Sequence, residues 1–115
     1  MNIVVVTEDD GVQIMSLSDD DNDPKHYIIL QRDVDSNSDE ENLGLDGCYV
    51  ESTEFDDAGY DLISGYRLEG SKLTFQGAIS PVQDILSINL LLSDEKISLV
   101  ENTLSKLFRP KKKLP

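Results

Sequence analysis

The segment "LISGYRLEGSKLTFQ", residues 62–76, constrains the fold more than any other part of the chain. A two-residue turn at Gly70 and Ser71 would place charge opposite charge and apolar opposite apolar side chains across two antiparallel strands. The expected pairs are Glu69 with Lys72, Leu68 with Leu73, and Tyr66 with Phe75. Because three pairs agree on one register, this segment predicts a β-hairpin. Ile63 and Arg67 then lie on the other face, with Gly65 as a bulge or close-approach position.

Further strands are predicted on both sides of this hairpin. A β-branched run and a turn at Asp10 and Gly11 predict a first hairpin within residues 2–17, in which Val6 faces Met15 and Val4 faces Leu17. The run "HYIILQR" is apolar enough for a strand that is buried on both faces or central in its sheet. Alternating residues also predict strands in "CYVEST" and in "QDILSINLLL".

A change of period after residue 92 predicts one helix. Ser93 is a suitable N-cap, Asp94 and Glu95 suit the positive end of the helix dipole, and Pro110 ends the helix. The apolar stripe consists of Ile97, Val100, Leu104, Leu107 and Phe108. We therefore expect an α+β fold: a mostly antiparallel sheet of five to seven strands with one C-terminal amphipathic helix packed on it. Residues 1–109 would form a single domain, and residues 110–115 a basic, disordered tail.

The charge is distributed unevenly along the chain. Residues 1–61 carry 18 acidic side chains against Lys25 and Arg32, a balance of −16, whereas residues 62–115 have a balance of +3. Direct binding to nucleic acid is not expected, because phosphate contacts need clustered lysine and arginine. Such an acidic half favours attraction to a basic partner instead.

Cysteine content and hydropathy favour a cytoplasmic protein. Cys48 is the only cysteine and can form no internal disulfide. The first residues have no basic n-region of a signal peptide, and no stretch approaches the roughly 20 apolar residues of a spanning helix. We expect no membrane association, and a monomer or weak homodimer.

The sequence contains no motif that is typical of a catalytic or a metal-binding site. In the acidic run 19–23, a calcium loop would need glycine and glutamate where Pro24 and Leu30 stand. His26 has no accompanying nucleophile motif, and Cys48 lies in a predicted strand without a basic neighbour. We therefore predict no catalytic residue, no metal and no cofactor.

Acidic residues are interspersed with aromatic residues between residues 49 and 61. Aromatic anchors surrounded by charge are typical of protein interfaces. The plainer alternative is that the acids solubilise a turn while Phe55 or Tyr60 packs into the core. The candidate partner-binding residues are Tyr49, Glu51, Glu54, Phe55, Asp56, Asp57, Tyr60 and Asp61.

The same region resembles a known family. The stretches "GLDGCYVESTEFDDAGYDLISGYRLEGSKLTFQ" and "ILSINLLLSDEKISLVENTLSKLF" are similar to the pattern of immunity protein family ten, which comprises bacterial polymorphic-toxin immunity proteins. The resemblance implies a cytoplasmic, non-catalytic protein that binds and neutralises a cognate toxin domain. Toxin domains that attack nucleic acid are commonly basic, so Glu54, Asp56, Asp57 and Asp61 are expected to meet its lysines or arginines, with Tyr60 as an anchor.

A different class of function also fits the charge. An acidic interaction module, or a nucleic-acid charge mimic, would inhibit a basic DNA- or RNA-binding protein. The two hypotheses differ in breadth, because an immunity protein should bind one partner tightly whereas a mimic should accept several basic proteins.

Overall fold

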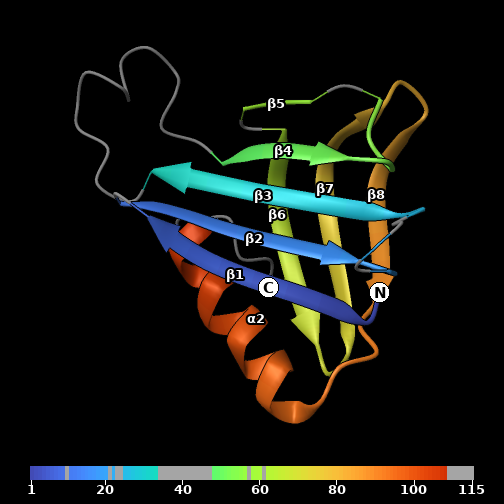
Figure 1. Ribbon diagram of the computed structural model, residues 1–115. Helices are drawn as coiled ribbons and strands as arrows, with labels where there is room; N and C mark the ends of the chain where they lie inside the picture. Colours follow the sequence, from blue (N-terminus) through green and yellow to red (C-terminus); the bar gives the residue numbers. More distant parts are fainter. Residues whose placement is uncertain are drawn as a thin grey trace.

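The computed structural model describes residues 1–9, 11–20, 22, 25–33, 48–56, 58–60 and 62–108. Within these residues, eight strands form two antiparallel sheets, and one helix packs beside them (Figure 1). Sheet A has the order β1 (Ile3–Asp9), β2 (Val12–Ser18), β3 (Tyr27–Asp33), β4 (Tyr49–Ser52), β5 (Gly59–Tyr60). Sheet B has the order β6 (Ile63–Glu69), β7 (Lys72–Ser80), β8 (Gln83–Asn89), and the helix is α2 (Asp94–Leu107).

The predicted α+β class, the antiparallel pairing and the C-terminal helix are confirmed. The described strands number eight, beyond the expected five to seven, and they divide between two sheets. The two-residue strand β5 is too short to leave a period in the sequence, since alternation needs several residues to be recognised.

The local pairings have the predicted registers. Across β6 and β7, Glu69 lies opposite Lys72 and Tyr66 opposite Phe75, and the turn residue Gly70 has φ of 59°, a conformation that glycine adopts without strain. Across β1 and β2, Val6 lies opposite Met15 and Val4 opposite Leu17. Because these pairs are close in sequence, turn chemistry and side-chain matching are sufficient to specify them.

The face assigned to Ile63 was wrong. The register of β6 shifts between Ile63 and Gly65, as the expected bulge at Gly65 implied, and the inserted residue reverses the alternation before it. Ile63 therefore points into the core, with 1% of its surface exposed, while Arg67 remains on the exposed face. Ile63 pairs with Gly77, where a Cβ atom would lie 2.0 Å from the carbonyl oxygen of Leu62.

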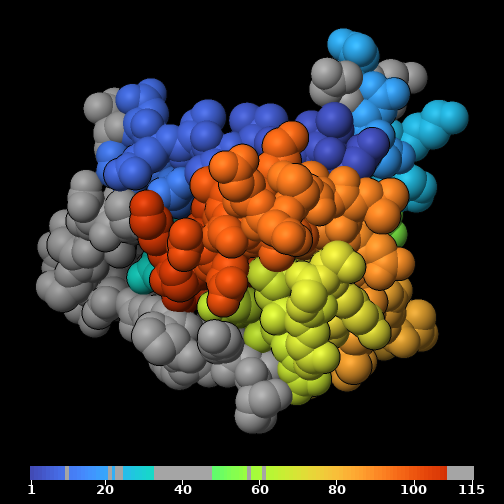
Figure 2. Space-filling model, turned by 90° about the horizontal axis from the view of Figure 1, so that it is seen from below, coloured from blue at the N-terminus to red at the C-terminus, as the bar shows by residue number. Residues whose placement is uncertain are grey.

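One hydrophobic cluster joins the two sheets and the helix. The strands of sheet A cross in front of those of sheet B in Figure 1, so the inner faces of the two sheets enclose side chains such as Met15, Leu30 and Phe75. Seen from below in Figure 2, α2 lies between the blue strands of sheet A and the yellow-green β6. The ring of Phe108 follows α2 and lies 5.1 Å from that of Tyr66 on β6.

Helix α2 begins and packs as the sequence predicts. The hydroxyl of Ser93 accepts a hydrogen bond from the Lys96 backbone N–H at 3.4 Å, and Asp94 and Glu95 occupy the first turn. Val100, Leu104 and Leu107 of the predicted stripe are fully buried. The helix therefore covers the end of the core that the two sheets leave open.

Several sequence-based expectations fall outside the described residues. They concern Asp10, Asp57, Asp61, most of the acidic loop 33–41, and the segment 109–115 with Pro110 and the basic tail. The single-domain boundary at residue 109 therefore stays a prediction. Within the described residues, no helix is both long and apolar enough to cross a bilayer.

Candidate protein-binding face

The face of sheet A that points away from the core is rich in apolar and aromatic side chains. Val50 of β4 is fully buried, so its neighbours Tyr49 and Glu51 point outward, and the strand registers assign the outward residues of the other strands. The outward set, here called the A face, consists of Ile3, Val5, Thr7, Ile14, Ser16, Ser18, Tyr27, Ile29, Gln31, Tyr49, Glu51 and Tyr60.

Two tyrosines form one corner of the A face. Tyr49 and Tyr60 lie directly opposite each other on β4 and β5, with ring centroids 5.3 Å apart in an edge-to-face arrangement. Tyr60 is 49% exposed, and Val5, near the opposite edge of the sheet, is 51% exposed. Large apolar groups are therefore accessible near both edges of sheet A.

The outer face of sheet B has a different character. Its outward residues are Arg67, Glu69, Lys72, Thr74, Gln76, Ile85, Ser87 and Asn89, among which Ile85 is the one large apolar side chain. A polar outer face is the ordinary state of a sheet that faces water. Of the two outer sheet faces, the A face is therefore the one that would bury more apolar surface if a partner covered it.

The A face also contains no basic residue. Arg32 of β3 points to the opposite side, where its Nη1 atom donates a hydrogen bond to the backbone carbonyl of Leu107 at 3.4 Å. Glu51 of β4 is half-buried on the A face and accepts a hydrogen bond from the Tyr27 hydroxyl at 3.4 Å. Negative charge on this face thus has no neighbouring cation on the strands.

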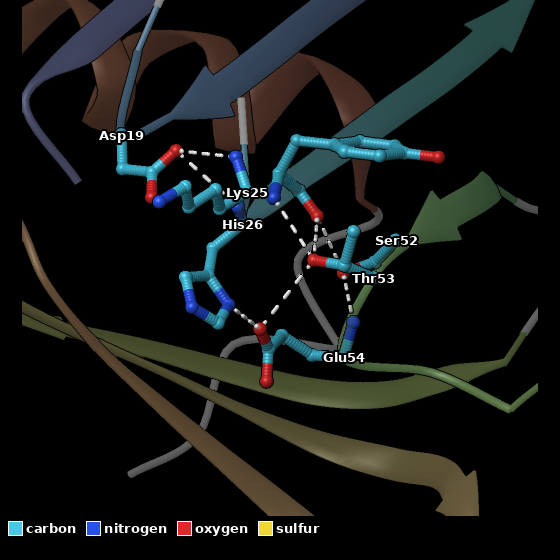
Figure 3. Close-up of polar contacts among 7 residues, drawn as sticks. Asp19, Lys25, His26, Ser52, Thr53 and Glu54 are labelled. Carbon is cyan, nitrogen blue, oxygen red and sulfur yellow. Dashed lines mark hydrogen bonds and ion pairs between the residues drawn. The ribbon is translucent and has the colours of Figure 1, made fainter. Parts of the chain in front are cut away.

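A polar network joins the segment before β3 to the turn after β4 and forms one edge of the A face (Figure 3). The Nδ1 atom of His26 lies 2.7 Å from Oε1 of Glu54. The Ser52 hydroxyl donates to the Tyr27 carbonyl at 2.7 Å and accepts from the Glu54 backbone N–H at 3.0 Å. These contacts hold Glu54 at this edge of the A face rather than on the face itself. The edge formed by Asp19, His26 and Glu54 is here called the rim.

Asp19 organises the other side of this network. Its carboxylate accepts the backbone N–H groups of Lys25 and His26 at 3.1 and 3.2 Å (Figure 3). The bond from His26, more than any other factor, lowers the pKa of Asp19 below its ordinary value of 3.8. The carboxylate therefore stabilises the folded state above that value, and this contribution is lost as the pH falls through the lower, folded-state pKa.

A titration can check this arrangement. We expect the carboxyl carbon of Asp19, followed by NMR, to titrate with a midpoint below 3.8, because two amide donors favour the ionised form. The amide signals of Lys25 and His26 should shift with the same midpoint. A midpoint at or above 3.8 would show that the carboxylate does not hold this loop.

The structure distributes the predicted site residues over several positions. Tyr49, Glu51 and Tyr60 come together on the A face, and Glu54 lies at its rim. Asp56 is exposed beyond the rim, where its backbone N–H donates to the carbonyl of Ile79 at 3.0 Å. The remaining three are Phe55, which is buried in the core with 7% exposed, and Asp57 and Asp61, which lie outside the described residues.

The plainer alternative, that Phe55 or Tyr60 packs into the core, thus holds for Phe55 and not for Tyr60. Burial removes the Phe55 ring from contact with any partner, so it supports the turn that carries Glu54 and Asp56.

A hollow on another side of the molecule, between α2 and β6, is lined by Tyr66 and Glu101. Burial, and then the charge of Glu101, raise the pKa of Tyr66 above its ordinary value of 10.0, so this phenol stays protonated at neutral pH. Among the described residues, no group of three or more His, Cys, Asp or Glu side chains could hold a metal ion.

A comparison with protein families identifies the chain. The family model described as Immunity protein 10 matches residues 1–97, which extend from the N-terminus to the first turn of α2. The chain belongs to the immunity protein 10 family. Neither the search of curated proteins nor the search of solved structures found a match.

Membership confirms the resemblance found in the sequence. Immunity protein 10 is a family of toxin immunity proteins, a class that typically acts by binding a cognate toxin and not by catalysis. The match also includes β1 to β3, which lie outside the region that carried the sequence resemblance. All five strands of sheet A therefore lie inside the family match.

Sequence reasoning missed the part of the A face of this immunity protein that lies on β1 to β3. The missed residues are Ile3, Val5, Ile14, Tyr27 and Ile29. A signal was present, because the run from Ile3 to Val6 is apolar in both phases of the alternation. Val4 and Val6 pack against the core, so Ile3 and Val5, which alternate with them along β1, point outward.

Proposed function

We propose that this immunity protein neutralises a cognate toxin domain in the cytoplasm by binding it with the A face and the adjoining rim. The observation that carries the proposal is the uncovered apolar and aromatic surface of sheet A, with Tyr60 and Val5 each about half exposed. Aromatic side chains in such a position are typical centres of protein interfaces. The family supplies the kind of partner, a toxin.

The negative charge of this chain favours a basic toxin domain as its partner. Residues 1–61 have a balance of −16, and the A face within them contains one acidic side chain, Glu51, and no basic one. Opposite charges on the two partners accelerate encounter and discriminate against acidic proteins. The same charge opposes direct association with nucleic acid, so the inhibitory contact is with the protein.

The size of the A face implies that the rim takes part. Five strands spaced by about 4.8 Å span about 20 Å, and the outward rows extend for about 15 Å along them. A standard interface covers about 800 Å² on each partner, which is more than such a patch provides. The network around Asp19, His26 and Glu54 continues the surface at one edge and supplies further negative charge.

Co-expression with a toxin domain tests the function. Cells that produce the toxin domain encoded beside this chain are expected to survive only when this protein is also produced, and the two proteins should elute as one complex from a sizing column. Survival without complex formation, or a complex without survival, would contradict neutralisation by direct binding.

The exposed carboxylate of Asp56, just beyond the rim, should help to steer the toxin into contact. We expect Asp56→Lys to slow association by roughly threefold or more at low ionic strength, because it replaces an attractive by a repulsive charge near the interface. Glu69→Lys makes the same charge change on β6, beside the Gly70 turn at the other end of sheet B, and serves as the matched control, since Glu69 is also exposed. Association rates from surface plasmon resonance should separate the two variants, and equal slowing by both would show that only net charge matters.

A nucleic-acid charge mimic is the second candidate, favoured by the charge balance of the first 61 residues. Such a mimic should bind several unrelated basic proteins with similar affinity. An apolar centre on the binding face instead gives high affinity only to a partner of complementary shape, which favours a single partner. Titration against lysozyme and a histone, beside the toxin domain, distinguishes the two.

A further inference from the structure

A trough runs along β2 on the A face. Its floor is formed by Ser16 and Ser18, which are small, while the neighbouring strands carry larger side chains at the paired positions. On β1 these are Ile3 and Val5, and on β3 they are Tyr27 and Ile29. Two ridges of large side chains on either side of two serines leave a hollow of about 330 Å³, lined by all six.

Two carboxylates lie at the margin of this trough. Glu51 lines it from β4, beyond Ile29, and Asp20 lines it where the chain leaves β2. The one hydrogen bond of the Glu51 side chain within the described residues is the 3.4 Å bond from Tyr27, and it has no cationic partner there. A half-buried carboxylate in this state gains considerably from a cation that reaches it.

The walls and the margin of the trough favour different parts of one ligand. Ile3, Val5 and Ile29 offer apolar contact to an aliphatic chain, and Glu51 and Asp20 offer oxygen atoms to a charged group at its end. Arginine combines a flexible apolar stem with a planar, always charged head that binds carboxylates with two parallel hydrogen bonds. The half-buried Tyr27 ring, next to Glu51, is also a surface on which a guanidinium group can stack.

We propose that this trough, hereafter the β2 trough, receives one arginine side chain of the toxin domain. The proposal rests on the proposed function and specifies its central contact: the arginine stem lies over Ser16 and Ser18, and its guanidinium group meets Glu51 and Asp20. A second copy of this chain is a poor occupant of the trough, because two A faces would bring acidic groups together without a base between them.

A titration with a small probe tests the β2 trough without the toxin. The probe is the tripeptide acetyl-Gly-Arg-Gly-amide, and the control is the same peptide with citrulline, which keeps the shape of arginine but has no charge. We expect the arginine peptide to cause saturable NMR shifts at Ser16, Ser18 and Glu51, with weaker or no shifts from the citrulline peptide. Equal shifts from both peptides, or shifts spread evenly over all exposed acids, would overturn the assignment.

Variants of the full chain then test the trough in the complex. We expect Glu51→Gln, which keeps the size of the side chain and its bond to Tyr27, to weaken toxin binding by about 10- to 100-fold. Asp84→Asn on sheet B removes the same charge away from the A face and should change affinity less than threefold. Isothermal titration calorimetry measures both.

The results separate this inference from the proposed function. If the unaltered protein binds the toxin tightly and Glu51→Gln binds it equally well, the protein is an immunity protein whose trough takes no arginine. If the unaltered protein binds no toxin domain, both proposals are overturned, whatever the peptide titration shows. Loss of affinity in Glu51→Gln alone, with shifts from the arginine peptide alone, supports the trough.

Discussion

Replacing Tyr49 and Tyr60 together with alanine is expected to weaken binding of the toxin domain by about 100- to 1000-fold. The two rings contact each other across β4 and β5 and are two of the three aromatic rings on the A face. Aromatic hot-spot residues of an interface each contribute about 2 kcal/mol or more, and every 1.4 kcal/mol corresponds to a tenfold change in Kd. Calorimetric titration of the double variant with the toxin measures the loss.

A matched control separates the tyrosine effect from general loss of exposed apolar surface. Val82 and Ile85 are also exposed, at 97% and 52%, but they lie on the turn and strand of sheet B. The double alanine variant of these two residues should keep the affinity of the unaltered protein. The tyrosine pair also contributes about 0.5–1.5 kcal/mol to folding, so circular dichroism must show that its variant is folded. Equal affinities for the two double variants would contradict binding by the A face.

Leu90→Ala is expected to lower the free energy of unfolding by about 2–5 kcal/mol, because it removes a buried side chain and leaves a cavity. Leu90 directly follows β8 and is 1% exposed within the cluster that joins the two sheets. Its backbone N–H also donates to the carbonyl of Ser71 at 2.7 Å, so the backbone cannot easily move to fill the space. The loss is large against the 5–15 kcal/mol that stabilise a typical domain.

The neighbouring leucine is the control for this variant. Leu91 is 74% exposed, so Leu91→Ala makes the same chemical change outside the core and should alter stability by about 0.5 kcal/mol or less. Urea denaturation followed by circular dichroism gives both values. A similar change for the two variants would mean that the segment after β8 is placed one residue out of register.

The sequence predicted those parts of the fold in which partners are close along the chain. The turn at Gly70 pairs residues at most nine positions apart between Tyr66 and Phe75, and side-chain matching selects one register. Helix α2 has its own start signal at Ser93 and a stripe of period 3.6. In each case the information lies within a few residues of the element that it specifies.

The division into two sheets could not be predicted in this way. Strand β4 pairs with β3, with Val50 opposite Leu30, and no local pattern selects this partner over a strand of sheet B. The contact of His26 with Glu54 likewise joins residues 28 positions apart. Such pairings are decided by the packing of the whole core, in which every strand has to bury one face.

The candidate site could be predicted only in part for the same reason. Phe55 and Tyr60 are both aromatic and five residues apart, yet one packs into the core and the other lies on the surface. The difference depends on β5, whose two residues pair Tyr60 with Tyr49 on the outer side of sheet A. Predicting the β2 trough requires still more strand pairings to be known, because its walls come from the strands on both sides of Ser16 and Ser18.

Cross-saturation NMR on the complex tests most directly whether sheet A carries the interface. Saturation is transferred from the unlabelled toxin domain to a deuterated sample of this immunity protein, and only residues in contact lose signal. We predict losses at Val5, Ser16, Ile29 and Tyr60, with unchanged signals at Thr74 and Ser87 on the outer face of sheet B. Losses at Thr74 and Ser87, with Val5 and Tyr60 unaffected, would contradict the assignment of the A face as the toxin-binding surface.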